Sequence, residues 1–346
     1  MYLIPRGNEG PYCTARFNMK FRINCTIPCY LLLLLLFLSN RVSAQYDAQV
    51  TQYMLAPSTF NPAVAGQGSD LTISLLNRQQ WVGIDNAPNS MFLNASMPFS
   101  LNNQKHGLGI LVLKESIGLF STQLIQLQYS YKKTMGEGEL SLGLQGGILQ
   151  ENFDADKIYI PTSDYHTSTD LSIPKGTLEG TIPDFSIGIW YDHNTYYGGL
   201  SVSHLLESTI KLKSGSDATD SESYKTIASR TYYLTNGYNI ALTNPLYTVQ
   251  PSFLLKTDLT SWQIDLSGKV LYKDKYWGGM SWRYQDAVNV MVGIKLPQGL
   301  SIGYAYGIST SAVAKFSSGS HEIFLGYVKK IGTASVSKKQ KSVRIL

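Results

Sequence analysis

The sequence predicts an all-β protein: a closed antiparallel transmembrane β-barrel of about fourteen strands, preceded by a short segment outside the barrel. Three observations carry this prediction. Several runs alternate between apolar and polar residues, the composition is poor in charge, and the long connections between runs all have odd numbers when counted along the chain.

The alternation is clearest between Trp262 and Tyr306, where four runs are separated by turns as short as Lys273-Asp274. In the first run, Ile264, Leu266 and Val270 fall on one face, and polar residues fall on the other. Successive side chains of a strand point to opposite faces, so a period of two predicts β-strands. Each run has roughly the ten residues that a tilted strand needs to cross a bilayer. The runs are Trp262–Leu271, Lys275–Tyr284, Ala287–Lys295 and Gly299–Tyr306.

The composition fits a membrane barrel better than a soluble domain. Of 346 residues, 15% are charged, whereas soluble domains carry about 25%. Uncharged polar residues, together with 30 Gly and 23 Tyr, replace the missing charge, as expected where half of each strand faces a polar lumen. The alternative is a large soluble β-sandwich or barrel. Most of the formal net charge of +5 lies in the first 44 residues, so no nucleic-acid binding is expected.

Residues 1–44 are predicted to be a signal peptide. The apolar run Leu31–Leu38 is too short to span a bilayer, and the small-residue pattern Val42-Ser43-Ala44 follows it. Met19 is a candidate for the true start, because Met19-Lys20-Phe21-Arg22 resembles an ordinary basic beginning. All three cysteines lie in this leader, so we expect no disulfide and no thiol chemistry in the mature chain. Export to the outer membrane of a Gram-negative cell is the expected destination.

The remaining chain divides into three parts. Residues 45–70 do not alternate and contain Pro57 and Pro62, so we expect an ordered periplasmic segment, with a short helix around Asp47–Met54. The barrel is expected over residues 71–330, followed by a basic tail, 331–346.

Ten further runs complete the predicted barrel. The final run has to pair with the first, because a sheet in lipid cannot leave an edge unpaired. The ten runs are Leu71–Asn77, Ser90–Pro98, Gly107–Ser116, Ser121–Lys132, Glu139–Gln150, Ile182–Tyr191, Thr195–His204, Ser229–Leu242, Leu246–Thr257 and Ser320–Lys330.

The connections predict an orientation. The long ones are the first, fifth, seventh and thirteenth: Arg78–Asn89, Glu151–Thr181, Leu205–Ala228 and Gly307–Gly319. Outer-membrane barrels have long extracellular loops and short periplasmic turns. We therefore expect the odd connections outside the cell and both termini in the periplasm.

Arg78, Gln80 and Trp81 form the most notable polar and aromatic group, at the exit from the first strand. They could fix an inward-folded loop or contact a partner. We favour the first interpretation, because buried Arg and Trp need satisfied partners and commonly hold a loop in place. The candidate structural or partner-contact residues also include Asn61 and Pro62, for which a turn role suffices, and Pro88 in the first long connection.

No pattern in the sequence predicts catalysis, a metal or a cofactor. The histidines show no spacing typical of metal ligands. Asp154 and Asp156, or the acidic residues between 217 and 222, could hold calcium, but solvated acidic loops are more common. Ser203 and His204 are adjacent in a predicted strand and would point to opposite faces, so they cannot act as a pair.

Several short motifs stand in a recognisable order: Tyr53-Met54, Asn61-Pro62-Ala63, Ala65-Gly66, Arg78–Gly83 and Ala87-Pro88. Together with later strand motifs up to Gly319–Tyr327, they resemble the PorP/SprF family of type IX secretion system outer-membrane proteins from Bacteroidetes. The resemblance covers essentially the whole mature chain. The basic tail after Tyr327 departs from the expectation that such chains end near the last strand.

The resemblance implies a non-enzymatic component of the type IX secretion or gliding apparatus. Such proteins either dock the periplasmic ring or gliding lipoproteins, or aid the export and surface anchoring of a secreted adhesin with a C-terminal sorting domain. We expect the long loops to face the cargo and the short turns to face periplasmic partners. The alternative is a passive outer-membrane pore or small-solute transporter, in which Lys132, Lys269, Arg283 and Lys295 would favour anions.

Overall fold

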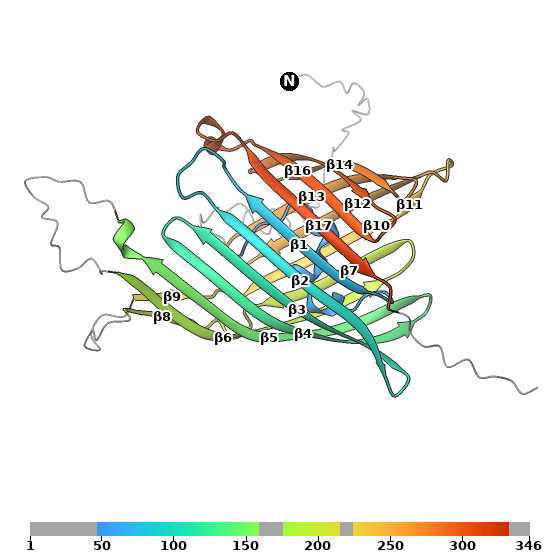
Figure 1. The fold of residues 1–346 in the computed structure, drawn as a ribbon, viewed down its shortest axis with the longest axis horizontal. Helices are drawn as coiled ribbons and strands as arrows, with labels where there is room; N and C mark the ends of the chain where they lie inside the picture. The colour runs from blue at the N-terminus through green and yellow to red at the C-terminus, as the bar shows by residue number, and fades with distance from the viewer. Residues whose placement is uncertain (1–46, 159–175, 215–223, 332–346) are drawn as a thin grey trace, which may run out of the picture. The chain divides into compact units, whose positions relative to one another are not determined.

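The computed structural model describes residues 47–158, 176–214 and 224–331, whose strands form one antiparallel sheet (Figure 1). The sheet closes because β1 pairs with β2 on one side and with β17 on the other. The ring has fourteen strands, as predicted. They are β1 (Leu71–Gln79), β2 (Asn89–Leu101), β3 (Gln104–Ile117), β4 (Phe120–Met135), β5 (Gly138–Asp154), β6 (Thr177–Asp192), β7 (Tyr196–Ser203), β10 (Thr231–Tyr238), β12 (Tyr247–Thr257), β13 (Trp262–Tyr272), β14 (Tyr276–Arg283), β15 (Ala287–Lys295), β16 (Leu300–Ser309) and β17 (Ser320–Lys329).

Three further strands extend the ring without enlarging it. β11 (Ile240–Ala241) follows β10 and pairs with β12. β8 (Thr209–Ser214) and β9 (Tyr224–Ile227) form a hairpin where the sequence indicated only a loop. β8 pairs with Leu178 and Glu179, near the beginning of β6. The hairpin is stabilised by Ile210 and Leu212, which are buried in an apolar cluster with side chains of β4, β5 and β6.

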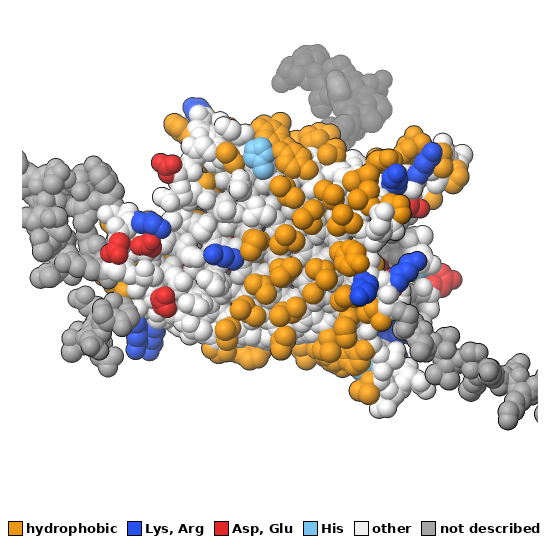
Figure 2. All heavy atoms as spheres, in the orientation of Figure 1, with side chains coloured by type: hydrophobic (Ala, Val, Ile, Leu, Met, Phe, Trp, Pro, Cys, Tyr) orange, Lys and Arg blue, Asp and Glu red, His pale blue; other side chains and the backbone are white. Residues whose placement is uncertain are grey.

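The wall has an apolar outer face and a polar inner face, as the alternation predicted. On β4, Ile125 and Leu127 are 45% and 68% exposed, whereas Gln126 and Gln128 are each 1% exposed. Apolar side chains form a broad band across the outer surface, and charged side chains gather toward the two ends (Figure 2). This is the surface expected of a barrel that meets lipid. No helix in the described part of the chain is long and apolar enough to cross a membrane.

The long connections share one end of the barrel, which we call the long-loop end. The described strands that flank residues 80–88, 155–176, 204–230 and 310–319 all end there. Tight turns such as Asn102-Asn103 and Gly136-Glu137 lie at the opposite, short-turn end. The strands continue past the apolar band at the long-loop end, because the paired outward residues Gln123, Gln150 and Thr181 are polar.

Residues 47–66, which we call the plug, lie inside the ring rather than ahead of it. The predicted helix over Asp47–Met54 is absent, and the described plug contains three single 3-10 turns: η1 (Tyr53–Leu55), η2 (Pro57–Thr59) and η3 (Pro62–Val64). The backbone N–H groups of Thr51 and Gln52 donate to the carboxylate of Glu322 on β17. The wall thus supplies hydrogen-bond partners that a helix would have found within itself.

An arginine on the lipid-facing band should destabilise the barrel in a position-dependent way. Leu127→Arg is expected to cost about 2–4 kcal/mol, because it places a charge near the bilayer midplane. Gln123→Arg, on the same face of β4 but beyond the band, is expected to cost less than about 1 kcal/mol. Denaturant unfolding in lipid vesicles measures both values, and equal costs would contradict this placement of the membrane.

Candidate functional site

The plug runs along the lumen from the long-loop end toward the short-turn end. Its first described residue, Asp47, bonds to His204 just beyond β7, while the carbonyl of Ala65 accepts from Ser130 on the far part of β4. Tyr53 is 1% exposed, and Ala65 is fully buried. The lumen is therefore occupied by the protein's own chain, and the contacts that hold it form the candidate functional site.

Glycines on the inner wall let the plug approach the strand backbone. A Cβ built on Gly143 of β5 would collide with the backbone of Ala63, and one on Gly107 of β3 would collide with the carbonyl of Ala65. A larger residue at either position would displace the plug or the strand. Glycine inside a strand often marks such a close approach of another backbone.

Asn61 anchors the middle of the plug. Its side-chain amide donates to the carbonyls of Ile189 and Leu200, at 3.1 and 3.2 Å, on the adjacent strands β6 and β7. Its Oδ1 accepts from the N–H of Ala63 and caps η3, in which Pro62 occupies the first position. The turn role expected for Asn61 and Pro62 is present, and it is combined with attachment to the wall.

Glu322 is the acceptor for the part of the plug nearer the long-loop end. It is 1% exposed and accepts from the N–H groups of Thr51 and Gln52 at 2.6 and 2.7 Å. Arg78 of β1 lies 3.5 Å from the same carboxylate and donates to the hydroxyl of Thr51. The ion pair thus joins the first and last strands of the ring to the plug.

Arg283, at the end of β14, makes a second buried attachment. It donates to Asp265 at 2.7 Å, to the carbonyl of Val50 at 3.1 Å and to Oε1 of Gln49 at 2.6 Å. Gln80 donates to the same oxygen of Gln49 at 3.2 Å. The bonds donated by the charged Arg283 are of the charge-assisted kind, which is roughly twice as strong as a neutral hydrogen bond.

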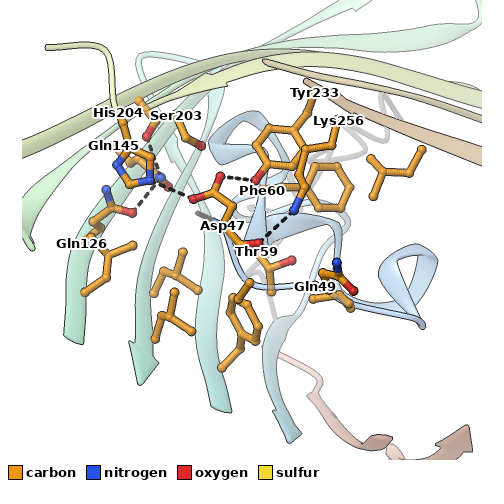
Figure 3. A pocket seen from close by; sticks show the side chains of 18 of the residues that line it. Asp47, Gln49, Thr59, Phe60, Gln126, Gln145, Ser203, His204, Tyr233 and Lys256 are labelled. Carbon is orange, nitrogen blue, oxygen red and sulfur yellow. Dashed lines mark hydrogen bonds and ion pairs between the residues drawn. The ribbon is translucent and has the colours of Figure 1, made fainter. Parts of the chain in front are cut away.

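Asp47 is held by a third cluster, which is drawn in Figure 3. One carboxylate oxygen lies 2.9 Å from Nε2 of His204, and the other accepts from the hydroxyl of Tyr233. Nδ1 of His204 lies 2.9 Å from Asp184 on β6. Lys256 donates to the Asp47 carbonyl at 2.8 Å. Three residues, His204, Tyr233 and Lys256, therefore hold the beginning of the plug, and Asp184 supports His204 from β6.

The electrostatics of this cluster favour a charged pair. Burial alone would lower the pKa of His204, but the carboxylates of Asp47 and Asp184 outweigh it and raise the pKa to about 10. Burial alone would raise the pKa of Asp47, but His204 and Lys256 hold it below its usual range. At neutral pH the imidazolium and carboxylate are both ionised and bonded.

The predicted site residues in and beside the first connection bind the plug through the side chains of Arg78 and Gln80, and hold the loop through backbone contacts. Arg78 and Gln80 point inward and are 2% and 6% exposed. Trp81 is half-buried and has a left-handed backbone (φ 52°), and its backbone N–H donates to Ser320 Oγ at 3.2 Å. The carbonyl of the buried Pro88 accepts from the N–H of Gln80. These contacts match the interpretation of an inward-folded loop.

The arrangement does not supply a nucleophile–base pair at Ser203 and His204. Both ring nitrogens of His204 are bonded to carboxylates, so neither can activate Ser203. Among the described residues, no group of three or more His, Cys, Asp or Glu side chains could hold a metal. Asp154 pairs with Lys157, and Asp156 accepts from the N–H of Gly176. The acidic residues between 217 and 222 lie outside the described residues.

Sequence reasoning missed Glu322 and His204 as wall residues that bind the plug, and Asp47 as the plug residue that His204 holds. A single acid or histidine on an inward strand face has no pattern that distinguishes a plug contact from a solvated lumen residue. The glycines did carry a signal, since Gly107 and Gly143 interrupt otherwise regular inward faces.

Gly143→Val is expected to expel the plug and open the lumen, because a Cβ there overlaps the Ala63 backbone. Gly268→Val on β13 is the matched control, since nothing lies within 4 Å of its Cβ position. Single-channel recording in planar bilayers should show steady conductance for the first variant and a closed protein for the second and for the wild type. If the Gly143→Val barrel is as closed as the wild type, the close approach of the plug to Gly143 does not hold it in place.

The Asp47–His204 contact predicts a pH dependence. Because the pKa of His204 is raised to about 10, its stabilisation is complete below the unfolded value of about 6.5 and is lost as pH rises through 10. The lowered pKa of Asp47 means that its stabilisation is present above about pH 3.9 and is lost on further acidification. Protease cleavage of the plug should accelerate between pH 7 and 10.5, after normalisation to an unfolded substrate. His204→Gln should flatten this rise, and an unchanged profile in that variant would refute the assignment.

Comparisons with known proteins bear on the family. The family described as "Type IX secretion system membrane protein PorP/SprF" matches residues 42–327. The structure is also similar to those of a CymD monoaromatic hydrocarbon channel (11% identity, 84% of this chain and 95% of that chain, TM-score 0.45) and of Omp33 from Acinetobacter baumannii (7% identity, 77% and 100%, TM-score 0.41). Those similarities are too low to support an inference, and no curated protein matches the sequence. Because the family match spans most of the chain, this protein belongs to the PorP/SprF family of type IX secretion system membrane proteins.

Proposed function

We propose that this protein is a non-enzymatic outer-membrane component of the type IX secretion or gliding apparatus, which acts through contacts at its two ends. The observation that carries this proposal is the plug. Residues 47–66 occupy the lumen and are bonded to Glu322, Arg283 and His204. A folded cargo domain cannot share the lumen with this segment. The proposed contacts with partners are therefore placed at the two ends of the barrel.

The long-loop end is the proposed contact for a secreted adhesin with a C-terminal sorting domain. There the wall continues beyond the apolar band, and the β8–β9 hairpin extends it. Lys211 and Lys225 are both exposed and stand directly opposite each other in that hairpin. Like charges opposite each other destabilise a strand pair, and an acidic partner surface would relieve the repulsion.

The short-turn end is the proposed contact for the periplasmic secretion ring or for gliding lipoproteins. The apolar band between the ends is the surface for outer-membrane lipid (Figure 2). We propose no role for nucleic acid and no cofactor.

A passive pore or small-solute transporter is the alternative function. Of the four lumen cations that motivated it, Arg283 and Lys132 donate to plug carbonyls, those of Val50 and Ala63. This use favours a role in retaining the plug over a role in selecting ions. A wild-type barrel with steady, ion-selective conductance would instead support the transporter.

The proposed roles of the two ends can be tested separately by paired charge reversals in cells that lack the wild-type gene. Lys211→Glu with Lys225→Glu is expected to reduce the amount of surface-retained adhesin several-fold, because the proposed acidic partner would be repelled. Lys133→Glu with Lys329→Glu is the matched pair at the short-turn end, where both side chains are exposed. Surface immunolabelling and assay of the spent medium measure retention.

Barrel abundance in the outer membrane, measured by heat-modifiable gel mobility, has to remain at the wild-type level in both doubly substituted proteins. If both pairs lower adhesin retention equally, or if neither does, the assignment of the long-loop end to the cargo is wrong.

A further inference from the structure

A cavity separates the plug from the wall at the short-turn end of the lumen. On the plug side it is lined by Leu55 and Val64, and on the wall side by Trp277, Lys295 and Ser301. β15 ends at Lys295, so these wall residues stand at the mouth that the short turns surround. The cavity is distinct from the contacts that hold Asp47 at the opposite end.

Two lysines face this part of the lumen without an acidic partner. Lys269 is only 9% exposed, and its electrostatic neighbour is another cation, Lys295. Neither side chain makes an ion pair within residues 47–158, 176–214 and 224–331. Lys105 and Lys132, by contrast, share Glu139 at 2.8 and 3.9 Å. A buried ammonium without a counter-charge is costly, so this region favours an added negative group.

Trp277 lines the same cavity and carries an unused donor. The residue is 5% exposed, and its indole N–H has no hydrogen-bond partner. The ring lies against Gly293 and Gly303, where added Cβ atoms would collide with or crowd it, so its position is fixed by the wall. A buried unsatisfied N–H costs about 1–3 kcal/mol, and an acceptor entering the cavity would remove that cost.

The polar groups that line the cavity fit a single carboxylate. Asp192 at the end of β6 also lines it and contributes one negative charge. Its charge opposes that of Lys295, so binding depends on the hydrogen-bond donors as well as on the lysine. Lys295, the Trp277 N–H and the Ser301 hydroxyl together offer one positive charge and two neutral donors, which suits a single carboxylate.

We propose that this cavity is a binding site for a carboxylate that enters from the short-turn end. Lys295 supplies the ion pair, the Trp277 indole and the Ser301 hydroxyl donate hydrogen bonds, and Lys269 adds a favourable field from deeper in the lumen. The carboxylate could be carried by a small organic acid or by an acidic side chain of a peptide, since both present the same chemistry. This site does not depend on the proposed secretion role.

The test is a titration of the purified full-length protein in detergent with sodium acetate, against sodium chloride at equal ionic strength. Thermal unfolding should shift upward with acetate more than with chloride, because a ligand that binds only the folded state stabilises it. The shift should saturate with acetate concentration and give a dissociation constant.

Two variants and two controls locate the site. Lys295→Gln and Trp277→Phe, which keeps an aromatic ring but removes the N–H, should each weaken acetate binding about fivefold or more. Lys275→Gln changes a nearby lysine that does not line the cavity. Trp190→Phe removes another buried, unpartnered indole N–H that packs against Ala63 and Val64. Both controls should bind acetate as the wild type does.

The peptide N-acetyl-Gly-Glu-Gly-amide and its Gln counterpart distinguish the sources of the carboxylate. Tighter binding of the Glu peptide than of acetate identifies a peptide ligand, and tighter binding of acetate identifies a small acid. Lys295 is exposed, so Lys295→Gln remains informative even if Trp277→Phe fails to fold. An acetate response equal to that of chloride, or one that Lys295→Gln leaves unchanged, overturns the proposal.

Discussion

Hydrogen bonding between the plug backbone and the inner wall is the interaction on which the rest of this structure depends. The lumen of a fourteen-stranded ring is wide enough to hold a segment of chain, and its wall carries buried charges such as Glu322 and Arg283. A chain without regular helix carries many unpaired N–H and C=O groups. The polar groups of the wall and of the plug backbone therefore satisfy one another. The carboxylate of Glu322 accepts from two backbone N–H groups, while Ser130 and Ser201 donate to the backbone carbonyls of Ala65 and Phe60.

The way the plug is held has a consequence for its stability. Its attachments are spread from Asp47 to Ala65 and reach β1, β4, β6, β14 and β17, and several involve buried charges. Removing one partner of a buried charged pair typically costs 3–5 kcal/mol. Releasing the whole segment would break many such contacts together, so the lumen does not open through small fluctuations. The plug is therefore fixed at many points along the lumen.

The barrel itself could be read from local patterns, whereas the site could not. Alternation in runs such as Trp262–Leu271 and the order of connection lengths were enough to count the strands and to pair the last with the first. The β8–β9 hairpin was missed because its strands are short and separated by polar residues. His204 was placed at the end of a predicted strand and given no role, although it joins Asp47 and Asp184, which lie 137 positions apart along the chain. Such a junction leaves no spacing in the sequence.

What the sequence by itself determined is therefore the wall: which residues alternate, which face meets lipid, how many strands there are, and which connections share an end. These properties follow from a period of two and from the requirement that no strand edge stays open in lipid. The tertiary structure decided what the wall encloses. Residues 47–66 have no periodicity, and their path is fixed by partners dispersed over strands that become neighbours only when the ring closes. The position of the plug, and the cavity left beneath it, arise from that closure.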